Sequence, residues 1–150
     1  PIAVQPWWRF VSNLFSIVAG LFFLITLAAH VAALVGVERP LGDYSMRLIY
    51  GLAIVWPPAV IAGTRLASSY PQKDFWKAAL RGCPRFTQSA IYVLSGYAML
   101  SMLIAVLLSP DHQPKNDPLL ALRALSAFLL TFYGVAVAIL YSAAHVNSLD

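Results

Sequence analysis

Four long apolar stretches constrain this chain more than any other feature of its sequence. They cover residues 10–36, 46–67, 86–108 and 119–145. At about 1.5 Å per residue the first reaches roughly 40 Å, which exceeds the thickness of a bilayer's hydrocarbon core. It is also longer than the core of a signal peptide, so we expect a retained span. The sequence predicts an all-α integral membrane protein whose single domain, residues 1–150, is an up-down antiparallel bundle of four transmembrane helices.

Composition supports the membrane class and excludes others. The chain is 60% hydrophobic and only 11% charged, whereas a soluble domain needs far more charge to cover its surface. The net charge is +4, but the basic residues lie in short connectors and not in an arginine-rich tail, so we expect no nucleic-acid partner. Cys83 is the only cysteine, which excludes an internal disulfide and a multi-cysteine metal site.

A basic segment, SSYPQKDFWKAALRGCPR at 68–85, joins the second and third stretches. Pro71 and Asp74 suit the first turn of a helix. Gly82 suits a left-handed cap, and Pro84 would stop further helix. The segment therefore predicts a short amphipathic helix at the membrane interface, about 71–82.

This predicted helix has a basic face and an aromatic-apolar face. At 100° per residue the charged side chains share one arc: Lys73, Asp74, Lys77 and Arg81. The opposite arc holds Phe75, Trp76, Ala78, Ala79 and Cys83. Such a helix lies flat among anionic headgroups or docks an acidic partner, although a solvated loop helix is the simpler reading. The candidate residues for binding a partner or lipid headgroups are Lys73, Phe75, Trp76, Lys77, Arg81 and Arg85.

Basic residues in the connectors predict the orientation. Six lie on one side of the bundle, namely Arg9, Arg65, Lys73, Lys77, Arg81 and Arg85, and four on the other, namely Arg39, Arg47, Lys115 and Arg123. Because Lys and Arg are in excess in cytoplasmic loops, we expect the first side to be cytoplasmic. Both termini would then be cytoplasmic, in a multi-pass protein of the inner or plasma membrane.

Small residues spaced four apart are the candidate helix contacts, since close approach holds helices together in lipid. They occur in the first stretch (Ala28, Ala32 and Gly36, or Ala29 and Ala33), the second (Ala59, Gly63 and Ala67) and the fourth (Gly134, Ala138 and Ser142). One of these stripes could instead face a second copy or another subunit. The partners expected are membrane lipids and other membrane subunits or a homo-oligomer.

Aromatic residues and prolines near mid-membrane define a possible intramembrane pocket. Trp56, Tyr97 and Tyr133 come out at similar depth, and could line a pocket or bond to the protein itself. Pro57 and Pro58 remove two backbone donors from the second stretch, which predicts a fixed bend or a broken helix at a solute pathway.

His30 is the ionisable residue of the first stretch and invites a haem or quinone reading. His30 and His145 fall near opposite membrane faces, roughly 25–30 Å apart, so one copy cannot hold haem b between them. His30 could be a lone axial ligand or pair with its counterpart in a dimer. The simpler alternative is a neutral imidazole bonded to a carbonyl or to Tyr50.

Catalytic groups are sparse. The interiors of the four stretches contain no Asp, Glu or Lys, and Asp111, His112 and Asp117 share a loop whose spacing fits no metal motif. We therefore expect neither an enzyme nor a resident cofactor. The first hypothesis is a non-catalytic subunit that scaffolds or regulates a larger membrane complex. The alternatives are a haem- or quinone-binding redox subunit using His30, and a small-solute or lipid pathway at Pro57 and Pro58.

Overall fold

The computed structural model describes residues 2–3, 5–37, 39–108, 118–146 and 148–149. Four long helices make up the bundle: α1 (Pro6–Leu34), α2 (Arg39–Leu66), α4 (Arg85–Leu108) and α5 (Pro118–His145). Each is long and apolar enough to cross a membrane, which confirms the predicted four-span membrane bundle. Near the chain ends, β1 (Ile2–Ala3) and β2 (Ser148–Leu149) form a two-residue antiparallel pair.

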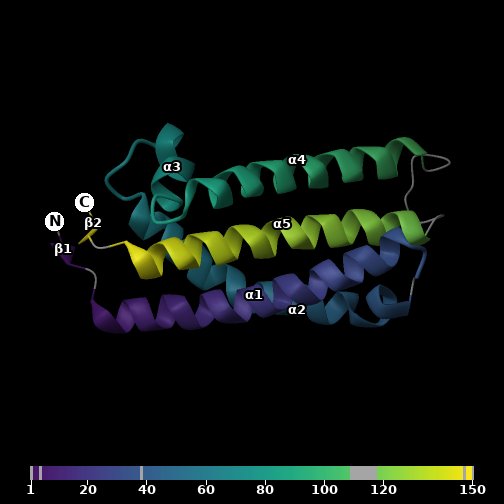
Figure 1. Cartoon of the computed structure of the whole chain (residues 1–150), viewed down its shortest axis with the longest axis horizontal. Helices are drawn as coiled ribbons and strands as arrows, with labels where there is room; N and C mark the ends of the chain where they lie inside the picture. The colour runs from purple at the N-terminus through teal and green to yellow at the C-terminus, as the bar shows by residue number, and fades with distance from the viewer. Residues whose placement is uncertain (1, 4, 38, 109–117, 147, 150) are drawn as a thin grey trace.

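Helix α5 is the axis of the bundle. It lies between α1 and α4, with α2 behind, and it contacts all three (Figure 1). It buries 56% of its most apolar stretch inside the protein, whereas α4 buries only 17%. Both chain ends lie at one end of the bundle, together with α3 (Phe75–Ala79). Helix α4 therefore presents most of its surface to lipid.

Small residues bring the other helices close to α5. Ala59 and Gly63 of α2 are buried, and a Cβ on Gly63 would lie 3.5 Å from Ile139 of α5. In α1 the buried pair is Ala29 and Ala33, with Ala33 fully covered. The stripe of Ala28, Ala32 and Gly36 is more exposed. The structure thus selects one of the two α1 stripes that the sequence offered.

The connector between α1 and α2 is shorter than predicted. Helix α1 ends at Leu34, and Gly36 adopts a left-handed φ of 87°. Gly36 N–H donates to the Ala33 carbonyl at 3.2 Å and Val37 N–H to the Ala32 carbonyl at 2.9 Å, which is a Schellman motif. Helix α2 then begins at Arg39, so most of the sequence between the first two apolar stretches, residues 37–45, is helical.

Helix α2 stays helical through Pro57 and Pro58. The two prolines leave the carbonyls of Ala53 and Ile54 without their usual helical donors. Helix α2 is therefore continuous at mid-depth, and the broken-helix alternative has no gap in α2 to support it.

The predicted interfacial helix over 71–82 is much shorter in the structure. A 3₁₀ turn, η1 (Gln72–Asp74), leads into α3, which ends at Ala79. Cys83 N–H then donates to the Leu80 carbonyl at 2.9 Å in a turn. Among the described glycines only Gly36 has a positive φ, so Gly82 is not the predicted left-handed cap. The helix stops early because Gly82 packs directly on α5.

Gly51 of α2 offers a test of this packing. A Cβ there would lie 2.6 Å from the Tyr133 hydroxyl and 2.7 Å from the Phe22 ring, both fixed in the core. We expect Gly51→Ala to lower the free energy of unfolding in detergent by about 1–3 kcal/mol, because the core is overpacked. Gly96→Ala is the control, since a Cβ there meets nothing within 4 Å. Equal stability of the two variants would contradict the packing described.

Candidate functional site

The basic segment between α2 and α4 is held firmly against α5. Gly82 N–H donates to Ser142 Oγ at 2.9 Å, and Cys83 Sγ donates to the Ala138 carbonyl at 3.1 Å. A Cβ on Gly82 would come within 2.7 Å of the Ser142 carbonyl oxygen, so glycine allows this close approach. Ala78, Ala79 and Leu80 are all buried. The apolar face that we expected to meet lipid headgroups instead packs into the bundle.

The two aromatic residues of the segment have different environments. Phe75 is half-buried against the core, 3.4 Å from a Cβ placed on Gly63. Trp76 is 45% exposed and packs edge to face with Phe75 at 5.4 Å between ring centroids. Trp76 and Trp56 also line a cavity of about 230 Å³ beside α4 and α5. Of the two rings expected to insert among headgroups, only Trp76 is free to do so.

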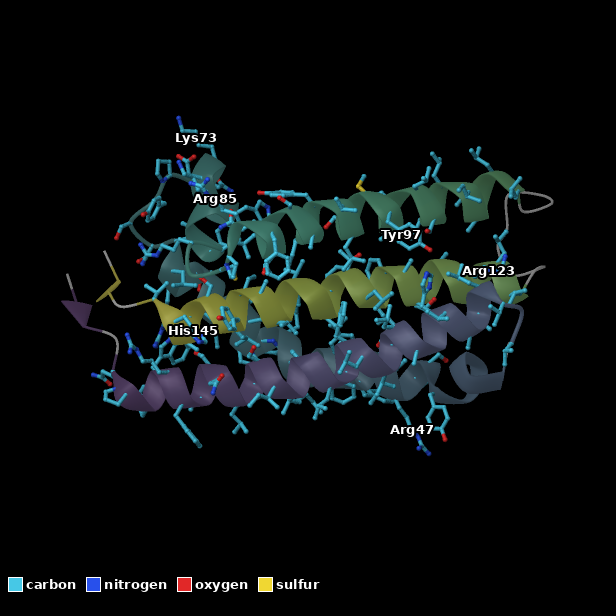
Figure 2. All side chains as sticks on the ribbon, viewed as in Figure 1. Arg47, Lys73, Arg85, Tyr97, Arg123 and His145 are labelled. Atoms are coloured by element: carbon cyan, nitrogen blue, oxygen red, sulfur yellow. The ribbon has the colours of Figure 1, made fainter. Side chains whose placement is uncertain are left out.

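Cations gather at the end of the bundle that carries this segment. Figure 2 shows Lys73 and Arg85 there, with His145, while Arg47 and Arg123 lie toward the other end. Lys73, Lys77 and Arg85 are exposed. Arg81 is held within the segment, because its guanidinium lies 5.7 Å from the centre of the Tyr70 ring. This end therefore carries the exposed cations of the basic segment.

Arg65 strengthens the same end from α2. Its guanidinium lies over the Trp8 ring, 4.3 Å from the centroid. Cation–π contact of this kind holds the charge in place without neutralising it. The charge of Arg65 therefore adds to the basic surface while its side chain joins α1 to α2.

His30 forms the second candidate site, a polar cluster inside the bundle. The imidazole is only 4% exposed. Its Nδ1 lies 2.6 Å from Ser126 Oγ, and its Nε2 lies 2.7 Å from the Tyr97 hydroxyl. The expected alternative partner, Tyr50, is 64% exposed instead. The cluster therefore joins α1 to α5 and α4.

The protons of this cluster follow from its acceptors. Ser126 has one hydroxyl proton, and its oxygen lies 2.7 Å from the Leu122 carbonyl, which can only accept. His30 Nδ1–H then donates to Ser126 Oγ. If the imidazole is neutral, its Nε2 accepts from the Tyr97 hydroxyl, and both ring nitrogens are used. A haem iron could reach His30 only if one of these hydrogen bonds broke.

Sequence reasoning missed two residues of this region. Ser126 is fully buried, but nothing in the sequence separates it from other serines of the spans. Arg123 was counted only as a connector cation. Its side chain donates to the carbonyls of Ala33 at 2.9 Å and Leu34 at 3.2 Å, where α1 ends. A cation near the C-terminus of a helix is favourable. The signal available in the sequence was that Arg123 and the end of the first apolar stretch fall on the same side of the membrane.

The structure separates the residues of the predicted intramembrane pocket. Tyr133 is fully buried, stacks on Phe22, and donates to the Leu48 carbonyl at 2.5 Å. Trp56 packs against Phe132, with 4.9 Å between ring centroids. Tyr97 bonds to His30. These side chains mainly join helices.

Metal-binding groups do not converge in the part of the chain that the structure describes. There, no three His, Cys, Asp or Glu side chains lie close enough to share an ion. Asp111, His112 and Asp117 fall outside the described residues.

Cys83 reports on the docking of the basic segment. Its burial raises the pKa of the thiol to about 11, although the nearby Ser142 backbone lowers it slightly. At pH 8 the thiolate fraction is then small, so we expect maleimide to label Cys83 at least tenfold more slowly in mild detergent than in sodium dodecyl sulfate. Labelling should accelerate as pH rises toward 11. Equally fast labelling in both detergents would show that the segment is not docked.

The His30 cluster should couple energetically. We expect His30→Leu and Tyr97→Phe each to destabilise the bundle, and the double variant to lose less than their sum. A double-mutant cycle on unfolding in detergent should give a coupling of about 0.5–2 kcal/mol, the range of hydrogen bonds between membrane helices. Additive effects would mean that the hydrogen bond contributes nothing.

Comparison with known proteins gives no relative from which a role could be transferred. No family model matches the chain, and no curated protein and no solved structure matches it.

Proposed function

We propose that this protein is a non-catalytic subunit of a larger membrane complex, and that residues 72–85 are its docking surface for an acidic partner. Its place would be the inner or plasma membrane, with both termini and this surface in the cytoplasm. That orientation follows from the excess of Lys and Arg at this end. The four apolar helices support a multi-pass membrane protein.

The observation that carries the proposal is the firm attachment of a cationic segment. Gly82 and Cys83 bond to Ser142 and Ala138 of α5, and Gln88 Nε2 donates to the carbonyls of Leu80 and Cys83, each at 3.2 Å. A segment that only connects two spans does not need such contacts. Because the segment is already ordered, a partner would lose little conformational entropy on binding.

The charge of the surface defines the chemistry of the partner. Lys73, Lys77 and Arg85 point outward, and the acidic residue of the segment is Asp74. Trp76 lies between these cations and is 45% exposed. Exposed cations beside an indole ring favour an acidic protein surface with an apolar patch.

The His30 cluster supports this reading over the redox alternative. The hydrogen-bonding groups of His30 are paired with Tyr97 and Ser126. The three residues therefore link α1, α4 and α5. A quinone or haem site would instead need an open donor or acceptor beside a cavity. The solute-pathway alternative loses its main support because α2 continues through Pro57 and Pro58.

Charge reversal tests the docking surface. We expect Lys73→Glu with Lys77→Glu to reduce recovery of co-purifying membrane proteins by about tenfold, since each attraction becomes a repulsion. Both side chains are exposed, so folding should be unaffected. Arg47→Glu is the control, because Arg47 is an exposed cation toward the other end of the bundle.

Recovery must be measured after mild extraction, by quantitative mass spectrometry. Equal partner recovery from the double variant and the wild type would contradict the proposal. If no protein is lost but binding to liposomes containing phosphatidylglycerol falls, the surface binds lipid headgroups instead, and the docking role is wrong.

A further inference from the structure

An apolar groove runs along α5 on the face between α1 and α4. Its volume is about 540 Å³. The walls include Ile17 and Leu24 of α1 and Ile91 of α4, and the floor includes Gly134 and Ala138 of α5. Thr87 is the one lining side chain with a polar group. The groove is open on one side, where the bilayer would lie.

Small residues keep this groove open. A Cβ built on Gly20 meets nothing within 4 Å, so the space beside Gly20 is unfilled by the protein. In a bilayer such a space is occupied by a hydrocarbon chain or by a neighbouring helix, since water is absent there. The length of the groove and the side chains at its end indicate which of the two occupies it.

The groove occupies about one leaflet. On α4 it extends from Phe86 to Leu94, about 12 Å of helix rise. Half of a hydrocarbon core is about 15 Å, whereas a spanning helix extends through the whole core of roughly 30 Å. Phe86 is the second residue of α4, so the groove begins at the cationic end of the bundle. A single acyl chain fits this extent better than a spanning helix does.

Polar side chains continue both groove faces toward that end. At 100° per residue, Arg9 and Asn13 lie on the same arc of α1 as Ile17 and Leu24. On α5 the arc of Gly134 and Ala138 continues to Tyr141 and His145 in the same way, and these two rings stack at 3.9 Å.

A hydrogen bond places the two polar groups beside each other. Arg9 Nη2 donates to the carbonyl of Val146 at 3.0 Å, which brings the guanidinium to the residue that follows His145. Asn13 and His145 are exposed. The surface thus changes from cationic and hydrogen-bonding at the bundle end to purely apolar one or two helical turns deeper.

We propose that this groove is a binding site for one phospholipid. An acyl chain lies on Gly134 and Ala138, and the phosphate meets Arg9, Asn13 and His145. Arginine and phosphate form strong charge-assisted hydrogen bonds, and the volume is within the range of about 300–1,000 Å³ for ligand sites. This inference does not depend on the docking role of residues 72–85.

Gly20→Leu tests the acyl-chain part, because the new side chain would fill the groove from α1. Gly96→Leu is the matched control, since it makes the same substitution on α4, also with open space, away from the groove lining. After exhaustive exchange into mild detergent, native mass spectrometry should show one retained phospholipid on the wild type and on Gly96→Leu. Retention by Gly20→Leu should fall about tenfold, and the unfolding temperatures of the two variants should agree once both are free of lipid.

Arg9→Gln tests the phosphate part. Glutamine keeps an N–H donor for the Val146 carbonyl but removes the charge. Re-addition of phosphatidylglycerol should then require about tenfold more lipid, as expected for loss of one charge-assisted hydrogen bond, while re-addition of dioleoylglycerol is unchanged.

Three results would overturn the proposal. The first is a wild-type protein that retains no phospholipid. The second is equal retention by Gly20→Leu and Gly96→Leu. The third is a retained polypeptide, or a second copy of this chain, that Gly20→Leu releases, because the groove would then bind a helix. None of these results bears on the charge reversal at Lys73 and Lys77.

Discussion

Close backbone approach along α5 is the constraint on which this bundle depends. In lipid there is little hydrophobic drive for helices to pair, so contact area and interhelical hydrogen bonds must hold them. Gly63 of α2, Gly82 of the basic segment and Ala33 of α1 all supply the small surfaces that such contact requires. Because three spans meet α5, it is the most buried helix, and α4, which packs mainly on α5, is left facing lipid.

Polar side chains complete the same interfaces. Tyr133 donates to the Leu48 carbonyl, Thr131 to the Leu94 carbonyl at 3.2 Å, and Ser16 to the Val137 carbonyl at 3.4 Å, each across a helix pair. A hydroxyl in hydrocarbon needs an acceptor, and a backbone carbonyl can accept a second hydrogen bond. The hydrogen bonds of His30 belong to the same set of contacts between helices. The buried polar groups therefore hold the helices together, whereas the exposed cations lie at one end of the bundle.

The sequence predicted what depends on local composition. Apolar length alone predicted the four spans, and short connectors predicted their antiparallel order. The sequence could not predict how each helix is rotated about its axis. Tyr50 or a backbone carbonyl was therefore expected as the partner of His30, whereas the structure has Tyr97 and Ser126. The end of α3 was also missed, because Gly82 meets Ser142, a residue sixty positions away, and no local signal reports that contact. The same limit applies to the predicted pocket, because helix rotation decides which of Trp56, Tyr97 and Tyr133 can face one another.

Oxygen accessibility of nitroxide side chains in a bilayer would test the central role of α5 most directly. Labels would be placed singly along α5 and α4 in a Cys83→Ser background. Ala136 is fully buried on α5 and Met99 is 75% exposed on α4. The account predicts low oxygen collision rates through the middle of α5, and high rates around most of α4. Equally high rates on both helices would contradict it.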